Sequence, residues 1–70
     1  MIRTPVTSSD LCSVGYDPRT QILEIEFHSG SVYQYAGVRQ SVYLSLMQAP
    51  SHGRYFAAYI KHGYPCNRIV

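Results

Sequence analysis

The segment 21–27 constrains the fold of this chain more than any other. Its apolar residues, Leu23, Ile25 and Phe27, alternate with two glutamates, and a period of two is typical of a β-strand with one buried and one solvated face. We therefore expect this segment to be a strand of an antiparallel sheet, with its glutamates on the solvated face.

Turn signals bound this strand on both sides. Residues 17–20 (Asp-Pro-Arg-Thr) combine a proline that presets φ with an aspartate that can bond the following backbone. After the strand, Gly30 can take the positive φ of a tight hairpin. Residues 11–16, with a bulge expected at Gly15, and residues 32–35 complete a predicted three-stranded meander.

The period changes to helical after Gly37. Val38, Val42 and Leu46 recur at intervals of four, so residues 39–48 predict a short amphipathic helix.

A second helix is expected to follow, with Ser51 as its N-cap and Gly63 at its C-cap position. The fold class is therefore α+β: a three-stranded antiparallel meander followed by two short helices packed on one face, with an extended C-terminal tail. Residues 1–10 are interpreted as a polar N-terminal arm and residues 11–70 as a single domain.

The register of the β-hairpin decides whether Tyr33 and Tyr35 are buried. A two-residue loop would pair them with the two glutamates of segment 21–27, and directly paired residues share a face, so both rings would be solvated. A three-residue loop with Gly30 as a bulge pairs them with leucine and isoleucine and buries them. Burial is the commoner fate of large aromatics in a small domain; the solvated register would form a Tyr-x-Tyr platform for base stacking.

The charge is unevenly distributed along the 70 residues, whose net charge is +2. Residues 1–30 hold two arginines against four acids, whereas residues 31–70 hold no acid. The cations of this second half are Arg39, Arg54, Lys61 and Arg68. A basic half suits a polyanionic partner, although four solvated cations also fit an ordinary surface.

The remaining signals point away from membranes, metals and catalysis. No apolar run approaches the ~20 residues of a membrane span, and the first residues lack the apolar core of a secretion signal, so we expect a cytoplasmic protein. Cys12 and Cys66 have no metal-ligand spacing, and free thiols are expected in a reducing compartment, although a bridge would add ~4 kcal/mol. His62 and Cys66 are separated by a glycine and a proline, so nothing orients them for catalysis. We expect no enzymatic activity, no cofactor and no small-molecule substrate.

Several short motifs together resemble the KTSC domain family. They are Val14-Gly15-Tyr16-Asp17, Leu23-Glu24-Ile25-Glu26-Phe27, Ser29-Gly30, Tyr33-Gln34-Tyr35, Gly37-Val38, Tyr55-Phe56, Ile60-Lys61 and Tyr64-Pro65. A central Tyr-x-Tyr is the hallmark of that family, which occurs at the C-terminus of some lysyl-tRNA synthetases and as free-standing small bacterial proteins. RNA binding has been suggested for the family, so the resemblance implies a binding module without an established activity.

Two functions remain open for such a module. In the first, it binds RNA or another nucleic acid, with tyrosines stacking on bases and cations neutralising phosphates. The residues expected to form this site are Tyr33, Tyr35, Arg39, Arg54, Tyr55, Lys61 and Arg68. In the second, it is a protein–protein interaction module with no nucleic-acid affinity, in line with its low charge and abundant tyrosine.

Overall fold

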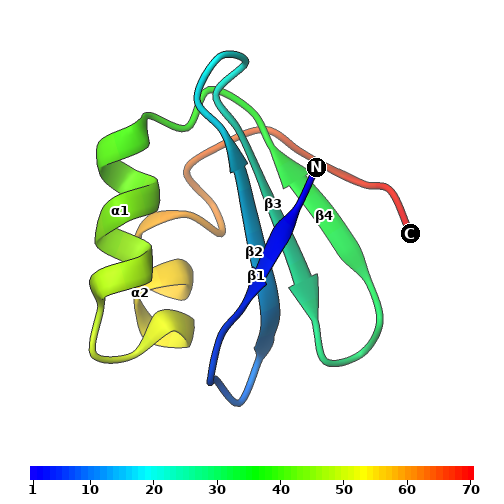
Figure 1. The fold of residues 1–70 in the computed structure, drawn as a ribbon, viewed down its shortest axis with the longest axis vertical. Coiled ribbons are helices and arrows are strands. Elements are labelled where there is room, and N and C mark those ends of the chain that lie inside the picture. The colour runs from blue at the N-terminus through cyan, green and yellow to red at the C-terminus, as the bar shows by residue number, and fades with distance from the viewer.

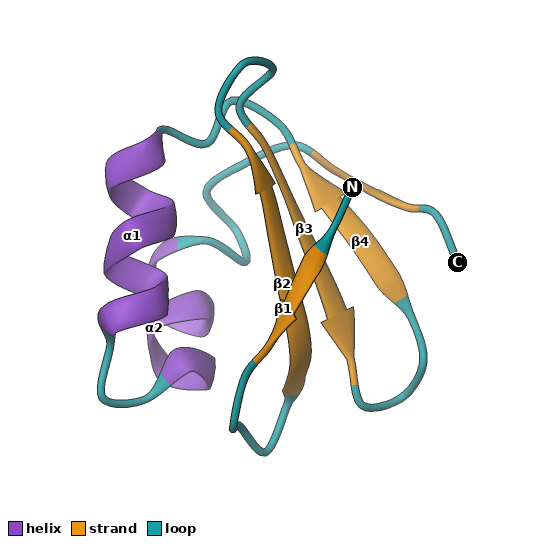
Figure 2. Cartoon of the chain, in the orientation of Figure 1, coloured by secondary structure: helices purple, strands orange, loops and turns teal.

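Five antiparallel strands form one sheet, and two helices cover one of its faces, in the computed structural model, which describes residues 1–70 (Figure 1). The strands lie side by side in chain order, β1-β2-β3-β4-β5. The elements are β1 (Arg3–Pro5), β2 (Leu11–Asp17), β3 (Ile22–Phe27), β4 (Val32–Tyr35), α1 (Gln40–Gln48), α2 (His52–Tyr59) and β5 (Cys66–Arg68). The fold is α+β, as expected, with both helices between β4 and β5 in the chain (Figure 2).

The sheet has two more strands than the predicted three-stranded meander. β1 lies within residues 1–10, the expected polar arm, and pairs with β2. β5 lies within the expected extended tail and pairs with β4. Both strands have three residues that are mostly exposed, so they lack the alternating pattern by which a strand is recognised in a sequence.

The β3–β4 hairpin adopts the register that turns both tyrosines toward the helices. Leu23 pairs with Tyr35, and Ile25 pairs with Tyr33. The turn is a three-residue loop in which Gly30 has a φ of 95°. The solvated Tyr-x-Tyr platform of the alternative register is therefore not formed.

The bulge of β2 lies at Cys12 and not at Gly15, because the pairing with β3 shifts between Leu11 and Ser13. Gly15 has a different role. A Cβ at this position would lie 3.0 Å from the backbone oxygen of Ile2. The missing side chain therefore lets the N-terminal segment approach β2 closely.

Both helices lie where the sequence predicts them, but α2 is shorter than expected. The Ser51 side chain accepts a hydrogen bond from the backbone N–H of Arg54 at 3.2 Å, which confirms the N-cap. The C-cap is Ile60 and not Gly63. Lys61 therefore lies in a turn that follows the helix.

The face of the sheet that the helices cover contributes to a single core. Its nine buried residues come from the sheet, from the loop before α1, and from both helices and the C-cap of α2: Leu11, Val14, Leu23, Ile25, Tyr35, Val38, Leu46, Phe56 and Ile60. No helix of the chain is long and apolar enough to cross a bilayer.

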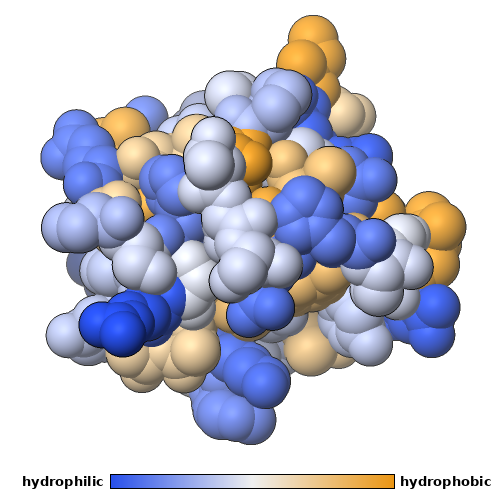
Figure 3. Space-filling view, turned by 90° about the horizontal axis from the view of Figure 1, so that it is seen from below, coloured by the Kyte–Doolittle hydropathy of each residue, from blue (hydrophilic) through white to orange (hydrophobic).

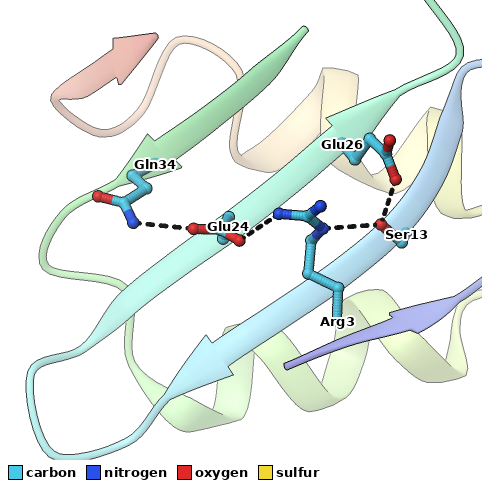
Figure 4. A network of polar contacts seen from close by, with 5 residues as sticks. All are labelled: Arg3, Ser13, Glu24, Glu26 and Gln34. Carbon is cyan, nitrogen blue, oxygen red and sulfur yellow. Dashed lines mark hydrogen bonds and ion pairs between the residues drawn. The ribbon is translucent and has the colours of Figure 1, made fainter. Parts of the chain in front are cut away.

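A polar network covers the opposite face of the sheet (Figure 4). Glu24 accepts hydrogen bonds from Gln34 at 2.9 Å and from Arg3. Arg3 also donates to the Ser13 hydroxyl at 3.0 Å, and that hydroxyl donates to Glu26 at 2.8 Å. Glu24 is only 4% exposed, so the expectation that both glutamates are solvated is wrong for Glu24.

Candidate functional site

A cleft of about 440 Å³ opens between α2 and strands β3–β5 on the face that the helices cover. Its volume lies in the range of small-ligand sites, roughly 300–1,000 Å³. The lining residues are Asp10, Phe27, Tyr33, Tyr35, Phe56, Ala57, Lys61, His62 and Cys66. The fold thus brings both tyrosines of the Tyr-x-Tyr motif together with a cation.

Four of these side chains form a chain of edge-to-face aromatic contacts. The ring centroids of Tyr33 and Phe27 are 5.8 Å apart at an interplanar angle of 81°. Phe56 lies 5.5 Å from Phe27 and 5.5 Å from Tyr35, at 65° and 77°. Aromatic pairs favour such tilted arrangements. Because Phe56 and Tyr35 belong to the core, this aromatic floor is already formed in the folded protein.

Tyr35 has its ring in the core and borders the cleft. The residue is 4% exposed, and no hydrogen bond joins its hydroxyl to another protein group. No fully buried polar side-chain atom lacks a partner in this structure, so the hydroxyl of this cleft-lining residue is not fully buried. Burial, with smaller effects from Cys66 and Tyr33, raises the pKa of Tyr35 to about 12. The hydroxyl therefore stays protonated and can both donate and accept a hydrogen bond.

Polar side chains surround this floor. Lys61 and His62 come from the turn after α2, Asp10 comes from the loop between β1 and β2, and Cys66 comes from β5. The backbone N–H of Lys61 donates to the carbonyl of Phe56 at 2.9 Å, which fixes the start of the turn. The rim therefore offers one fixed cation, one carboxylate and one imidazole.

The structure places the other predicted site residues elsewhere. Arg54 and Tyr55 line a separate groove of about 350 Å³ along α2. Arg39 is the N-cap residue of α1 and is exposed. Arg68 pairs with Tyr33 across the β4–β5 ladder. Of the seven predicted residues, the cleft brings together Tyr33, Tyr35 and Lys61.

Sequence reasoning missed most of the cleft lining. Phe27 and Phe56 look like core residues in the sequence, which they also are. They nonetheless also line the cleft, which the sequence alone does not show. The pairing of Cys66 with Tyr35 depends on β5, which has no strand pattern of its own, so no local signal could have placed Cys66 here.

The structure shows no metal-binding cluster and no disulfide. No three His, Cys, Asp or Glu side chains lie close enough together to hold a metal ion, and Cys12 and Cys66 are free thiols. Burial, reinforced by Glu26, raises the pKa of the Cys12 thiol. Because the thiolate is the reactive form, Cys12 is a poor nucleophile.

The fold and the cleft together define a small α+β domain with an aromatic cleft between α2 and the sheet, and comparison with known proteins places it in a family. The model of the KTSC domain matches residues 7–64. The crystal structure of a KTSC domain protein from Yersinia pestis matches with a TM-score of 0.96 and 42% identity, over 99% of this chain and 97% of that one. The chain belongs to the KTSC domain family.

Relatives include both a protein of similar size and a much larger one. An uncharacterised protein from Stutzerimonas stutzeri is 50% identical over 56 residues, which cover 80% of this chain and 79% of that protein. A lysine–tRNA ligase from a Nostoc species is 50% identical over 46 residues, which cover 66% of this chain but only 8% of the ligase. The similarity to the ligase is thus confined to a small part of its length.

Proposed function

We propose that this KTSC domain is a non-catalytic module that binds single-stranded RNA at the aromatic cleft. The observation that carries the proposal is the convergence of Tyr33, Tyr35 and Lys61 on one site. Single-stranded nucleic acids are bound by aromatic side chains that contact bases and by cations that contact the backbone. The similarity to a segment of a protein named lysine–tRNA ligase supports an RNA context.

The charges around the cleft set the kind of affinity to expect. Lys61 lines the cleft, and Arg68 pairs with a cleft residue in the sheet. Two neutralised phosphates correspond to a slope of about −1.4 in a plot of log affinity against log salt for single strands. Binding should therefore be weak and only mildly salt-dependent, with most of its free energy coming from contact with the aromatic floor.

Titration of a short fluorescent single-stranded RNA, followed by anisotropy at about 50 mM and about 200 mM salt, tests this proposal. Lys61→Ala should weaken binding by roughly threefold to tenfold. Arg19→Ala is the matched control, because Arg19 is exposed in the β2–β3 turn and outside the cleft lining, and it should leave the affinity unchanged. The absence of binding at low salt, or equal losses in the two variants, would overturn the proposal.

A protein–protein interaction module is the second candidate, and it is favoured by a different surface. Tyr55 and Tyr59 border the groove along α2 with ring centroids 4.7 Å apart, and Tyr59 is 64% exposed. Tyrosine is enriched at protein interfaces. The end of the molecule seen in Figure 3 is mostly hydrophilic, with apolar areas that are interrupted by polar side chains. A complex that is lost in Tyr59→Ala and kept in Lys61→Ala would favour this second function.

A further inference from the structure

We infer that the cleft takes a single unstacked nucleotide, a nucleobase with one 5′-phosphate, and not a run of stacked bases. This inference rests on the proposed function of the cleft and names what enters it. It follows from where the aromatic rings lie, from a hydroxyl without a protein partner, and from the charges at the rim.

The sheet offers no surface on which several bases could stack in a row. The register of the β3–β4 hairpin turns Tyr33 and Tyr35 toward the helices. The other face carries the polar network that joins Gln34, Glu24 and Arg3 (Figure 4). RNA-binding sheets that hold two or three bases do so with aromatic rings on an open face. Here both motif rings line one cleft of about 440 Å³.

The Tyr35 hydroxyl can pair with a polar ligand group. The residue is 4% exposed and lines the cleft, and its hydroxyl is not fully buried and makes no hydrogen bond within the protein. The edge of a nucleobase carries both donors and acceptors, and a protonated phenol can pair with either kind. A base lying against the aromatic floor thus suits both the rings and the hydroxyl.

The rim charges limit the number of phosphates. Lys61 is the one fixed cation that lines the cleft, and the carboxylate of Asp10 is part of the same lining. A lysine ammonium suits one phosphate group as a point charge. Within the cleft, further phosphates would lie near the Asp10 carboxylate with no second cation in the lining, and like charges in proximity are unfavourable. Asp10 can instead accept a hydrogen bond from a ribose hydroxyl or an exocyclic amino group.

Ala57 provides a way to close the cleft without touching the core. It lies in α2, lines the cleft and is exposed, so Ala57→Leu adds bulk at the site and keeps a good helix former. Ala58→Leu is the matched control. Ala58 is the next residue of the same helix and is also exposed, but it borders the other groove and not the cleft. Tyr35→Phe keeps the ring in the core and removes only the hydroxyl.

The experiment titrates the four nucleoside 5′-monophosphates, adenosine, ribose 5-phosphate and ATP into the whole chain, by NMR and by competition with the fluorescent RNA. We expect at least one monophosphate to displace the RNA and to bind more tightly than adenosine, ribose 5-phosphate or ATP. Ala57→Leu should lower its affinity by about tenfold or more and Ala58→Leu by less than about twofold, while Tyr35→Phe should lower it by about fivefold.

The possible failures separate this inference from the proposed function. If RNA binds but no monophosphate displaces it, the single-nucleotide site is wrong and RNA binding by the domain remains. If Ala57→Leu and Ala58→Leu behave alike, the cleft is not the binding site. An unchanged affinity in Tyr35→Phe would overturn the role assigned to the Tyr35 hydroxyl. If neither RNA nor any nucleotide binds at low salt, both proposals are overturned.

Discussion

At the scale of single residues, Glu24 is a carboxylate almost completely buried within a sheet of a 70-residue chain. Burial alone would raise the pKa of its carboxyl group. The hydrogen bonds from Gln34 and Arg3, together with the positive charge of Arg3, outweigh burial and lower that pKa. The carboxylate is therefore stabilised by partners that come from β1 and β4, the strands on either side of the β2–β3 pair.

Arg3→Met should destabilise the protein because it leaves Glu24 buried without its cation. We expect a loss of about 1–3 kcal/mol near neutral pH, since Arg3 is partly exposed and the pair is not fully desolvated. The pKa of Glu24 is lower in the folded than in the unfolded state. Its contribution is therefore present above the unfolded value of about 4.3 and is lost as the pH falls through the folded value.

Urea denaturation of wild type and Arg3→Met at neutral and at strongly acidic pH measures this difference. The gap in the free energy of unfolding should shrink in acid. Arg19→Met, which removes an exposed arginine outside the network, serves as the control and should change stability little at either pH. A gap that does not depend on pH would contradict the assigned role of Glu24.

Tyr35 should ionise at a higher pH than a tyrosine in water. Burial raises its pKa to about 12, and burial also raises the pKa of Tyr16. Because the folded pKa of Tyr35 exceeds its unfolded value, its ionisation in the unfolded state weakens folding as the pH rises above about 10. An ultraviolet titration of phenolate formation should show a late component that is smaller in Tyr35→Phe. A titration in which all tyrosines ionise together near 10 would place Tyr35 in solvent.

At the scale of elements, the central strands, both helices and the Ser51 cap follow from local patterns in the sequence. The edge strands β1 and β5 do not, because three mostly exposed residues carry no periodic signal. They pair with β2 and β4, so their position depends on the rest of the sheet. The end of α2 was also missed. Ile60 and Lys61 both donate backbone hydrogen bonds to the carbonyl of Phe56, and Ile60 is fully buried, so packing ends the helix before the glycine that looked like its cap.

The candidate site was predictable to a similar extent. Tyr33, Tyr35 and Lys61 were identified from a motif and from charge, and they do lie together. Arg39 and Arg54 are predicted only for their charge, and Tyr55 only as additional aromatic surface. The packing of the helices separates these residues, and no local pattern specifies that packing.

The two hairpin turns should respond to substitution in opposite directions. Gly30 has a φ of 95° and Gln21 a φ of 58°, the one non-glycine residue with a positive φ. Gly30→Val should cost about 1 kcal/mol or more, because a β-branched residue resists this conformation. Gln21→Gly should stabilise by about 0.5–1 kcal/mol, because it removes the left-handed strain at a smaller entropic cost.

Thermal melting followed by circular dichroism compares these two variants with the wild type. The expected order of melting temperatures is Gln21→Gly, wild type, Gly30→Val. Unchanged melting of Gly30→Val would contradict the three-residue loop, and with it the register that turns the tyrosines toward the helices.

At the scale of the whole molecule, one small core connects every element except the two edge strands. Every pair of neighbouring strands in the sheet is also consecutive in the chain, so the sheet contains no crossover. The helices enter the chain between β4 and β5, and their apolar residues complete the core from one side. The free energy of unfolding of a domain of this size is only a few kcal/mol.

Leu46→Ala should therefore unfold a large fraction of the molecules. Leu46 is fully buried, and removing such a side chain costs roughly 2–5 kcal/mol. Leu44→Ala on the same helix is the matched control, since Leu44 is 45% exposed and its loss should cost far less. Chemical denaturation of both variants gives the comparison, and equal midpoints would mean that the buried face of α1 is assigned wrongly.

The cleft has a floor that belongs to the core and a rim that does not, and this division limits how its specificity can be changed. Phe56 and Tyr35 are core residues, so a new side chain there alters folding as well as contact with a ligand. Ala57, Lys61 and His62 are exposed, so they can be exchanged at little cost in stability. A library intended to redirect this domain to other ligands should therefore vary the rim and keep the floor constant.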